Sequence, residues 1–311
     1  MNGSESSHPM FTFAHLSDPH LAIQSAPGLR SLMNKRLIGY LSWRTKRQAI
    51  HETRVLAALT EAIKQARPDH IAITGDLTNI ALPAEFKEAR RWLEEFGPPR
   101  SITLVPGNHD AYVGVPWSAS LGLWAEYMRG DSQAMDSPED FPAIRIRGPV
   151  AFVGVSSAHP SAPHLAVGSL GSAQLAALGS ALAGLADKRL FRIILIHHPP
   201  VSGIVKPRAS LRDSAAFASV VAEAGAELVL HGHTHRMSHG EIATPRGPVP
   251  VIGVASASAR AQHAHREEAQ FHIYTVAGEP GRWQLDLDIR RLDEQALAFR
   301  TSRTLSVPIP A

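Results

Sequence analysis

The chain is 311 residues long, which suits one large layered domain with attachments or two ordinary domains. Apolar residues make up 44% of it and charged residues 19%, so the chain can bury a sizeable core and is too apolar for wholesale disorder. The formal net charge of +3 is too small to indicate a nucleic-acid partner. Because the chain has no cysteine, disulfide scaffolds, thiolate metal sites and cysteine nucleophiles are excluded, whereas 17 histidines make imidazole chemistry available.

Short apolar runs alternate with longer helical patterns along most of the chain. The runs predicted as buried strands are Phe11–Ser17, His70–Thr74, Ser101–Val105, Val150–Val155, Phe191–Ile196 and Glu227–Leu230. Helices are predicted between them at Thr45–Ala66, Pro83–Phe96, Gly171–Ala186 and Arg212–Ala224. After Gly232 the helical patterns stop, and further strands are predicted at Gly240–Ala243, Pro250–Val254, Phe271–Val276 and Trp283–Ile289.

This order of strand, loop and helix predicts a layered α/β domain in which helices cover the faces of sheets. We expect the domain to occupy residues 11–296, with a poorly ordered tail over residues 297–311. Residues 1–10 are polar, which predicts a disordered segment and no secretory signal peptide. No apolar run is long enough to span a bilayer, so a cytoplasmic location is expected.

Polar side chains gather in the loops that follow five of the predicted strands. These loops read Asp18-Pro-His20, Gly75-Asp76, Gly107-Asn-His-Asp110, His197-His-Pro-Pro200 and Gly232-His-Thr-His235. Each motif alone is more often structural, because a Gly-Asp pair is a common turn and a single histidine after a strand is usually satisfied in the core. Together they are candidates for one site, since ligands collect at the carboxyl ends of strands in open α/β sheets. Carboxylate, amide and imidazole groups suit a divalent metal of intermediate hardness.

In this order the five loops are similar to the blocks D-x-H, G-D, G-N-H-[DE], H and G-H-x-H of the calcineurin-like metallophosphoesterase superfamily. The resemblance covers roughly residues 11–276 and implies a four-layer αββα sandwich of two mixed β-sheets. The Gly-Asp block continues as Leu77-Thr78-Asn79, without the tyrosine of purple acid phosphatases or the arginine of Ser/Thr protein phosphatases. What remains resembles the bacterial branch that contains cyclic-nucleotide and glycerophosphodiester phosphodiesterases.

The resemblance implies a binuclear metal centre that cleaves a phosphodiester in a small-molecule substrate. One ion is expected on Asp18, His20, Asp76 and His235, and the other on Asp76, Asn108, His197 and His233. Asp76 would bridge ions about 3.5–4 Å apart, and a hydroxide between them would attack phosphorus in line with the leaving oxygen. Mn²⁺ or Fe²⁺ is expected, with Zn²⁺ or a mixed pair as alternatives. His109 is expected to stabilise charge or protonate the leaving group, with Asp110 orienting the ring of His109.

Residues 29–47 form a basic insert directly after the first motif. No acidic residue lies between His20 and Glu52, while lysines and arginines alternate with apolar residues at spacings of three and four. Three interpretations stay open: a helix whose apolar face packs on the domain, a lid or lipid-facing element, and a nucleic-acid contact. Asn34-Lys35-Arg36 and Trp43-Arg44 resemble the insert of calcineurin-like enzymes that cleave UDP-2,3-diacylglucosamine.

Two alternative functions follow from these observations. The insert favours a hydrolase of a lipid-linked diphosphate, bound peripherally at the inner face of the membrane. A non-catalytic metal-binding scaffold is the remote alternative, and the complete set of ligand types argues against it because a scaffold has no physical need to retain them.

Overall fold

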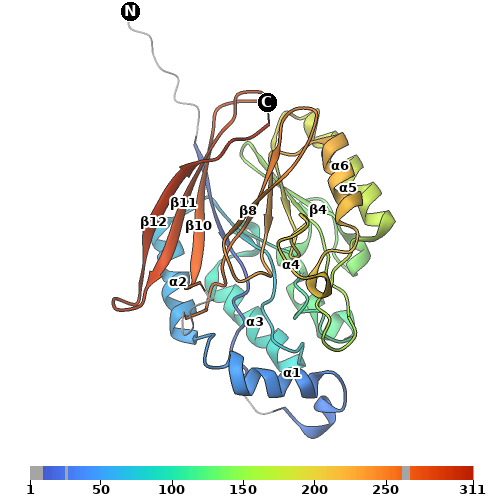
Figure 1. Ribbon diagram of the computed structural model, residues 1–311, viewed down its shortest axis with the longest axis vertical. Helices are drawn as coiled ribbons and strands as arrows, with labels where there is room; N and C mark the ends of the chain where they lie inside the picture. Colours follow the sequence, from blue (N-terminus) through green and yellow to red (C-terminus); the bar gives the residue numbers. More distant parts are fainter. Residues whose placement is uncertain (1–9, 25–26, 261–266, 311) are drawn as a thin grey trace, which may run out of the picture.

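The computed structural model describes residues 10–24, 27–260 and 267–310. Within these ranges the chain forms two six-stranded sheets of mixed direction that pack face to face, with helices on their outer faces (Figure 1). The predicted four-layer αββα sandwich is therefore confirmed. The segment predicted to be disordered, residues 1–10, lies outside the described residues except for Met10.

The first sheet has the strand order β12-β11-β10-β1-β2-β3. Its strands are β1 (Phe11–Leu16), β2 (His70–Ile73), β3 (Ile102–Leu104), β10 (Gln270–Ala277), β11 (Gln284–Asp293) and β12 (Ala298–Ser306). β1, β2 and β3 run parallel, whereas β10 pairs antiparallel with β1. Helices α2 (Thr53–Ala66) and α3 (Pro83–Phe96) contribute to the core on this sheet, and Leu56, Leu59 and Ile63 form the buried side of α2 at helical spacing.

The second sheet has the strand order β4-β5-β6-β7-β9-β8. Its strands are β4 (Ala143–Arg147), β5 (Val150–Gly154), β6 (Phe191–Leu195), β7 (Leu228–His231), β8 (Ser238–Ile242) and β9 (Val249–Gly253). Helices α5 (Gly171–Ala186) and α6 (Ser214–Ala224) cover its outer face (Figure 1). Every residue of β6 is buried, as expected for a parallel strand between a helical layer and another sheet.

Aromatic side chains join the inner faces of the two sheets. Phe13 of β1 meets Phe152 of β5 edge to face at 5.3 Å between ring centroids and stacks on Tyr274 of β10 at 4.8 Å.

Shorter helices connect the main elements. They are η3 (Pro99–Ser101), η4 (Trp117–Ala119), η5 (Leu121–Trp124), α4 (Ala125–Met128), η6 (Pro138–Asp140) and η7 (Pro207–Ala209).

The chain after Leu297 differs from the prediction of a poorly ordered tail. Residues 298–306 form β12, which pairs antiparallel with β11 at the edge of the first sheet. Most side chains of β12 are exposed, so the segment lacks the apolar alternation by which a half-buried strand is recognised. Val307 then packs into the core.

The insert forms η1 (Leu29–Leu32), α1 (Arg36–Ser42) and the π-helical turn η2 (Trp43–Arg47) at one end of the molecule (Figure 1). One interpretation of the insert was a helix whose apolar face packs on the domain. This interpretation holds for Trp43, which is buried. The aliphatic side chains of α1 point outward instead, while Arg36 is buried and donates hydrogen bonds to the carbonyl oxygens of Ile80 and Ala81. Among the described residues, no helix is both long and apolar enough to cross a bilayer.

The helix predicted over Thr45–Ala66 is interrupted. The chain leaves the helical conformation at residues 51 and 52, where His51 pairs with Ala259 in an isolated antiparallel bridge, and α2 begins only at Thr53. This interruption places the side chain of His51 beside the loops that follow β1 and β7.

Candidate metal centre

The side chains predicted to bind metal converge where the loops after β1, β2, β3, β6 and β7 meet. In the first group, Nε2 of His235 lies 3.1 Å from Oδ1 of Asp18 and 3.1 Å from Nε2 of His20. Nε2 of His20 lies 3.8 Å from Oδ2 of Asp76. One ligand atom from each of Asp18, His20 and Asp76 falls within 4.8 Å of the others, a spacing that can hold an ion.

The second group shares Asp76 with the first. Oδ1 of Asn108 lies 3.1 Å from Nε2 of His197 and 2.8 Å from Nδ1 of His233. Nε2 of His197 is in turn 3.4 Å from Oδ2 of Asp76, the oxygen that also faces His20. Asp76 therefore lies between two sets of nitrogen and oxygen donors, as a bridging carboxylate must.

Hydrogen bonds at the far sides of the imidazoles decide which nitrogens carry protons. Nδ1 of His20 lies 3.1 Å from the carbonyl oxygen of Thr78, and Nδ1 of His197 lies 2.6 Å from that of Thr74. A carbonyl oxygen only accepts, so these nitrogens donate and the opposite nitrogens direct lone pairs into the cluster. For His233 the assignment is reversed, because its Nε2 lies 3.0 Å from the carbonyl oxygen of Ala209.

The residues present therefore fit divalent cations. When both imidazoles are neutral, the lone pairs of His197, His233 and Asn108 face one another at about 3 Å, an arrangement that is repulsive unless a proton or a metal cation lies between them. In the first group, Oδ1 of Asp18 is buried, and its near contact is Nε2 of His235 at 3.1 Å, without the geometry of a hydrogen bond. Backbone carbonyl groups that accept a hydrogen bond from the second ring nitrogen of a ligand histidine, and so orient its ring, are typical of metal sites.

Backbone strain concentrates at the same residues. Asp18, His20, Asp76, His233 and His235 all have positive φ angles, between 41° and 69°. Non-glycine residues adopt this region at a cost of about 1–3 kcal/mol each, and they persist where the surrounding structure determines the site. The loops also need glycine for close approach: a Cβ at Gly107 would lie 2.2 Å from Oδ1 of Asp76.

His109 lies at this cluster, and its orientation differs from the prediction. Its backbone amide donates to Oδ1 of Asp76 at 2.7 Å, and its Nδ1 lies 2.5 Å from the carbonyl oxygen of Asn79. The ring stacks on Tyr112, with 5.7 Å between centroids and 5° between planes. Asn79 and Tyr112 therefore orient the imidazole of His109.

The prediction that Asp110 orients His109 is accordingly replaced. The carboxylate of Asp110 accepts hydrogen bonds from the backbone amides of Asp76, Thr78 and Gly107 at 2.8–2.9 Å. It joins the loop after β2 to the loop after β3 and so positions Asp76. Burial, followed by the neighbouring charge of Asp76, raises the pKa of Asp110 to about 7.

The electrostatics of the cluster favour cations. Burial alone would lower the pKa of His197, but its contact with the Asp76 carboxylate raises that pKa to about 9. The carboxyl group of Asp18 keeps its pKa well below the usual value despite its burial, because His235 faces it. Positive charge is thus stabilised at His197, whereas burial and neighbouring imidazoles lower the pKa values of His20 and His233.

His198, the neighbour of His197, has a structural role. It is buried, its Nδ1 lies 2.7 Å from Oγ of Ser157, and its Nε2 lies 3.2 Å from the carbonyl oxygen of Ala166. Both ring nitrogens therefore contact protein atoms away from the cluster.

His51 also lies at this cluster, although it belongs to none of the five motifs. The ligand nitrogens of His51, His20 and His235 lie within 4.8 Å of one another. A histidine at the end of a basic insert, outside every recognisable motif, gives no signal by itself. The tertiary contacts of residue 51 with Ala259 and Ser258 place it at the site.

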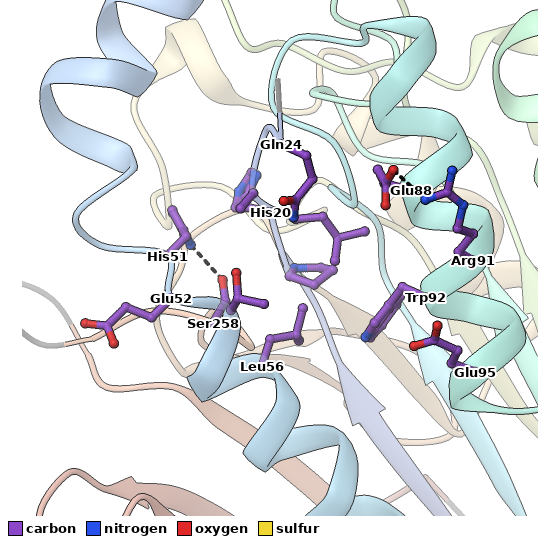
Figure 2. Close-up of a pocket in the computed structure, with 14 residues that line it drawn as sticks. His20, Gln24, His51, Glu52, Leu56, Glu88, Arg91, Trp92, Glu95 and Ser258 are labelled. Atoms are coloured by element: carbon purple, nitrogen blue, oxygen red, sulfur yellow. Dashed lines mark hydrogen bonds and ion pairs between the residues drawn. The ribbon is translucent and has the colours of Figure 1, made fainter. Parts of the chain in front are cut away.

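A cavity of about 200 Å³ opens beside the cluster between α2 and α3. Figure 2 shows His20, His51 and Ser258 on one wall, with Leu56 and Trp92 forming an apolar part of the lining. Glu88, Arg91 and Glu95 of α3 add charged groups to the lining.

Comparison with known proteins identifies the family and the fold. Residues 11–237 match the family model of calcineurin-like phosphoesterases. The chain is 27% identical over 241 residues to a cAMP/cGMP dual specificity phosphodiesterase of Mycobacterium tuberculosis, covering 76% of this chain and 65% of that protein. It is 30% identical over 183 residues to a probable cyclic nucleotide phosphodiesterase of Synechococcus, covering 58% of this chain and 63% of that protein. The chain thus spans slightly less than two thirds of the length of either relative.

A solved structure shares the fold. A dimetal phosphatase from Danio rerio superposes with a TM-score of 0.59 at 15% identity, covering 96% of this chain and 98% of that one.

Proposed function

Because the chain belongs to the calcineurin-like phosphoesterase family, we propose that it hydrolyses a phosphodiester with two divalent metal ions. The observation that carries this proposal is the convergence of imidazole, amide and carboxylate lone pairs around the shared carboxylate of Asp76. A cluster of this kind repels itself unless cations occupy it.

We assign the ligands of the two ions from the two groups of side chains. Asp18, His20, Asp76 and His235 would hold the first ion, and Asp76, Asn108, His197 and His233 would hold the second. The mixture of oxygen and imidazole donors suits Mn²⁺ or Fe²⁺, and also Zn²⁺ or a mixed pair. Two bound cations would polarise the phosphoryl group and activate a water molecule as the nucleophile.

The chain's own residues divide the remaining work. Asp76 lies between the two donor groups and fixes their relative positions. Asp110 holds Asp76 in place by accepting hydrogen bonds from the backbone amides of Asp76 and Gly107. His109 in its imidazolium form would supply its Nε2 proton to the leaving alkoxide oxygen and keep the Nδ1 proton that it donates to Asn79. The carbonyl oxygen of Asn79 and the ring of Tyr112 fix the plane of His109, which is what a general acid needs.

The test is hydrolysis by the chelated protein before and after addition of Mn²⁺. Bis-p-nitrophenyl phosphate, p-nitrophenyl phosphate and 2′,3′- and 3′,5′-cyclic nucleotides form the panel, because the relatives are described as phosphodiesterases of cyclic nucleotides. We expect turnover of the diesters to disappear on chelation, to return with Mn²⁺, and to be abolished by Asp76→Asn but not by the surface control Asp187→Asn. Diester turnover that survives exhaustive chelation and Asp76→Asn would contradict the proposal.

The insert supports a second candidate function, the hydrolysis of a lipid-linked diphosphate at an anionic membrane surface. Met33, Leu37, Ile38 and Leu41 have exposed fractions of 81%, 47%, 45% and 53%. The exposed Arg30 and Arg44 flank these side chains. An exposed apolar strip between cations, with no acid nearby in the sequence, complements an anionic lipid surface.

The insert is also attached beside the metal centre. Arg36 binds the backbone just after the Gly-Asp loop, and Nζ of Lys35 lies 4.2 Å from the ring centroid of Tyr112, the residue that stacks on His109. A lipid bound by α1 would therefore lie near the reacting groups.

Vesicle flotation tests this candidate with phosphatidylcholine vesicles that contain or lack phosphatidylglycerol. We expect binding to the anionic vesicles only, loss of binding in the triple variant Leu37→Ser, Ile38→Ser and Leu41→Ser, and no loss in the control Leu297→Ser. We also expect faster turnover of UDP-2,3-diacylglucosamine than of the small diesters. Absence of vesicle binding, or self-association that the triple variant abolishes, would reject the lipid surface as partner.

A further inference from the structure

His51 is held rigidly by the chain that surrounds it. Its backbone pairs with Ala259, and its Nδ1 lies 2.8 Å from Oγ of Ser258. The neighbouring Ser256 donates its hydroxyl proton to the carbonyl oxygen of Asp18 at 2.7 Å, so this segment also supports the first metal-binding loop. The side chain of His51 is buried and its position is determined from both sides.

The ring of His51 completes a cluster of three imidazoles. Its centroid lies 4.6 Å from that of His20 and 5.5 Å from that of His235. One ligand nitrogen from each of the three residues falls within 4.8 Å of the others. His20 and His235 also face the carboxylate of Asp18, so the three rings adjoin the first of the two donor groups.

We propose that His51 is an additional ligand of the ion held by Asp18, His20, Asp76 and His235. This inference rests on the proposed two-metal function and makes the centre asymmetric. The first ion would have five protein donors, whereas the second would have the four from Asp76, Asn108, His197 and His233.

The asymmetry has a consequence for substrate binding. Mn²⁺ and Fe²⁺ commonly take six ligands, so an ion with five protein donors keeps fewer positions for solvent or substrate than an ion with four. The second ion would then provide most of the contact with the phosphoryl oxygens. The first ion would be bound more tightly and would be the last to leave on chelation.

Mn²⁺ binding to the full chain tests the proposal without reference to turnover. Equilibrium dialysis with metal analysis gives the stoichiometry and affinity of both ions in the wild type, in His51→Ala and in the control His239→Ala, which changes an exposed histidine of β8. We expect His51→Ala to lower the affinity for one of the two Mn²⁺ ions at least 10-fold and to leave the affinity for the other within 2-fold of the wild type. We expect the control to match the wild type.

The visible spectrum of the Co²⁺-loaded protein gives an independent readout. Loss of a nitrogen ligand should change the d–d bands of one Co²⁺ ion in His51→Ala. Ser258→Ala removes the hydroxyl group that holds Nδ1 of His51 but keeps His51 as a ligand. It should therefore lower the affinity for the same ion by a smaller factor. This second variant keeps the proposal testable if His51→Ala fails to fold, as judged by circular dichroism.

The outcomes separate this inference from the proposed function. Unchanged Mn²⁺ affinities and Co²⁺ spectra in a folded His51→Ala variant would overturn it. So would a loss of turnover with unchanged metal binding, because His51 would then contact substrate from the cavity in Figure 2 rather than the ion. If the wild type binds two ions but cleaves no phosphodiester, the proposed function fails, while a weaker single site in His51→Ala still supports the ligand assignment.

Discussion

Substitution of Gly107 by alanine should displace the shared carboxylate while leaving its chemistry intact. The new Cβ would lie 2.2 Å from Oδ1 of Asp76, 2.5 Å from its backbone nitrogen and 2.8 Å from Cγ, whereas ordinary contact begins at 3.4 Å. The side chain cannot rotate away from the clash because the backbone nitrogen is also involved, so Asp76 must shift by roughly 1 Å. A displacement of this size in a catalytic group costs about 10²-fold in rate.

The assay measures kcat/KM for bis-p-nitrophenyl phosphate together with Mn²⁺ stoichiometry. We expect Gly107→Ala to lower kcat/KM by about 10²-fold and to weaken the binding of both Mn²⁺ ions, since both donor groups include Asp76. Stability should fall by about 1–3 kcal/mol, the usual cost of overpacking. Gly114→Ala is the matched control, because its Cβ would meet nothing within 4 Å. Normal turnover and normal binding of both ions in Gly107→Ala would refute the reasoning that Asp76 bridges two sites.

Three further outcomes are expected. Burial lowers the pKa of His70 to about 3 from 6.5, so the folded state excludes a proton that the unfolded chain binds below pH 6.5. His70→Gln should therefore lose about 2 kcal/mol less stability than the wild type between pH 7.5 and pH 5 in urea titrations, and parallel curves would contradict this. His109→Gln should lower kcat by about 10²-fold for alkyl leaving groups and much less for p-nitrophenolate, with Mn²⁺ affinity unchanged; an equal loss for both leaving groups would exclude the role of proton donor. Arg36→Ala should release the insert by removing two hydrogen bonds to backbone carbonyls, at a cost of about 2 kcal/mol. Limited proteolysis should then cut within residues 27–50 faster than in the wild type, and an unchanged rate would show that the hydrogen bonds of Arg36 are not what holds the insert.

Much of the fold could be predicted from local patterns. The helices at Pro83–Phe96 and Gly171–Ala186 have the predicted boundaries, because a proline or glycine marks each start and apolar residues recur at helical spacing. β12 was missed, because an exposed edge strand carries no buried face and therefore no alternation. The outward-facing aliphatic side chains of α1 were not predicted either, because the same apolar spacing suits a face packed on the domain or a face left open.

For the site, the sequence alone determined which residue types end the strands and how the metal-binding motifs are spaced, and from these the resemblance to metallophosphoesterases. Those features are local, since turns and strand ends depend on neighbouring residues. The tertiary structure alone decided that Asn79 rather than Asp110 orients His109, and that His51 lies against His20 and His235. These contacts join segments up to about 200 residues apart, and their partners are a backbone carbonyl and a histidine outside any motif. Only the packing of the two sheets and of the loops that follow their strands brings such groups together.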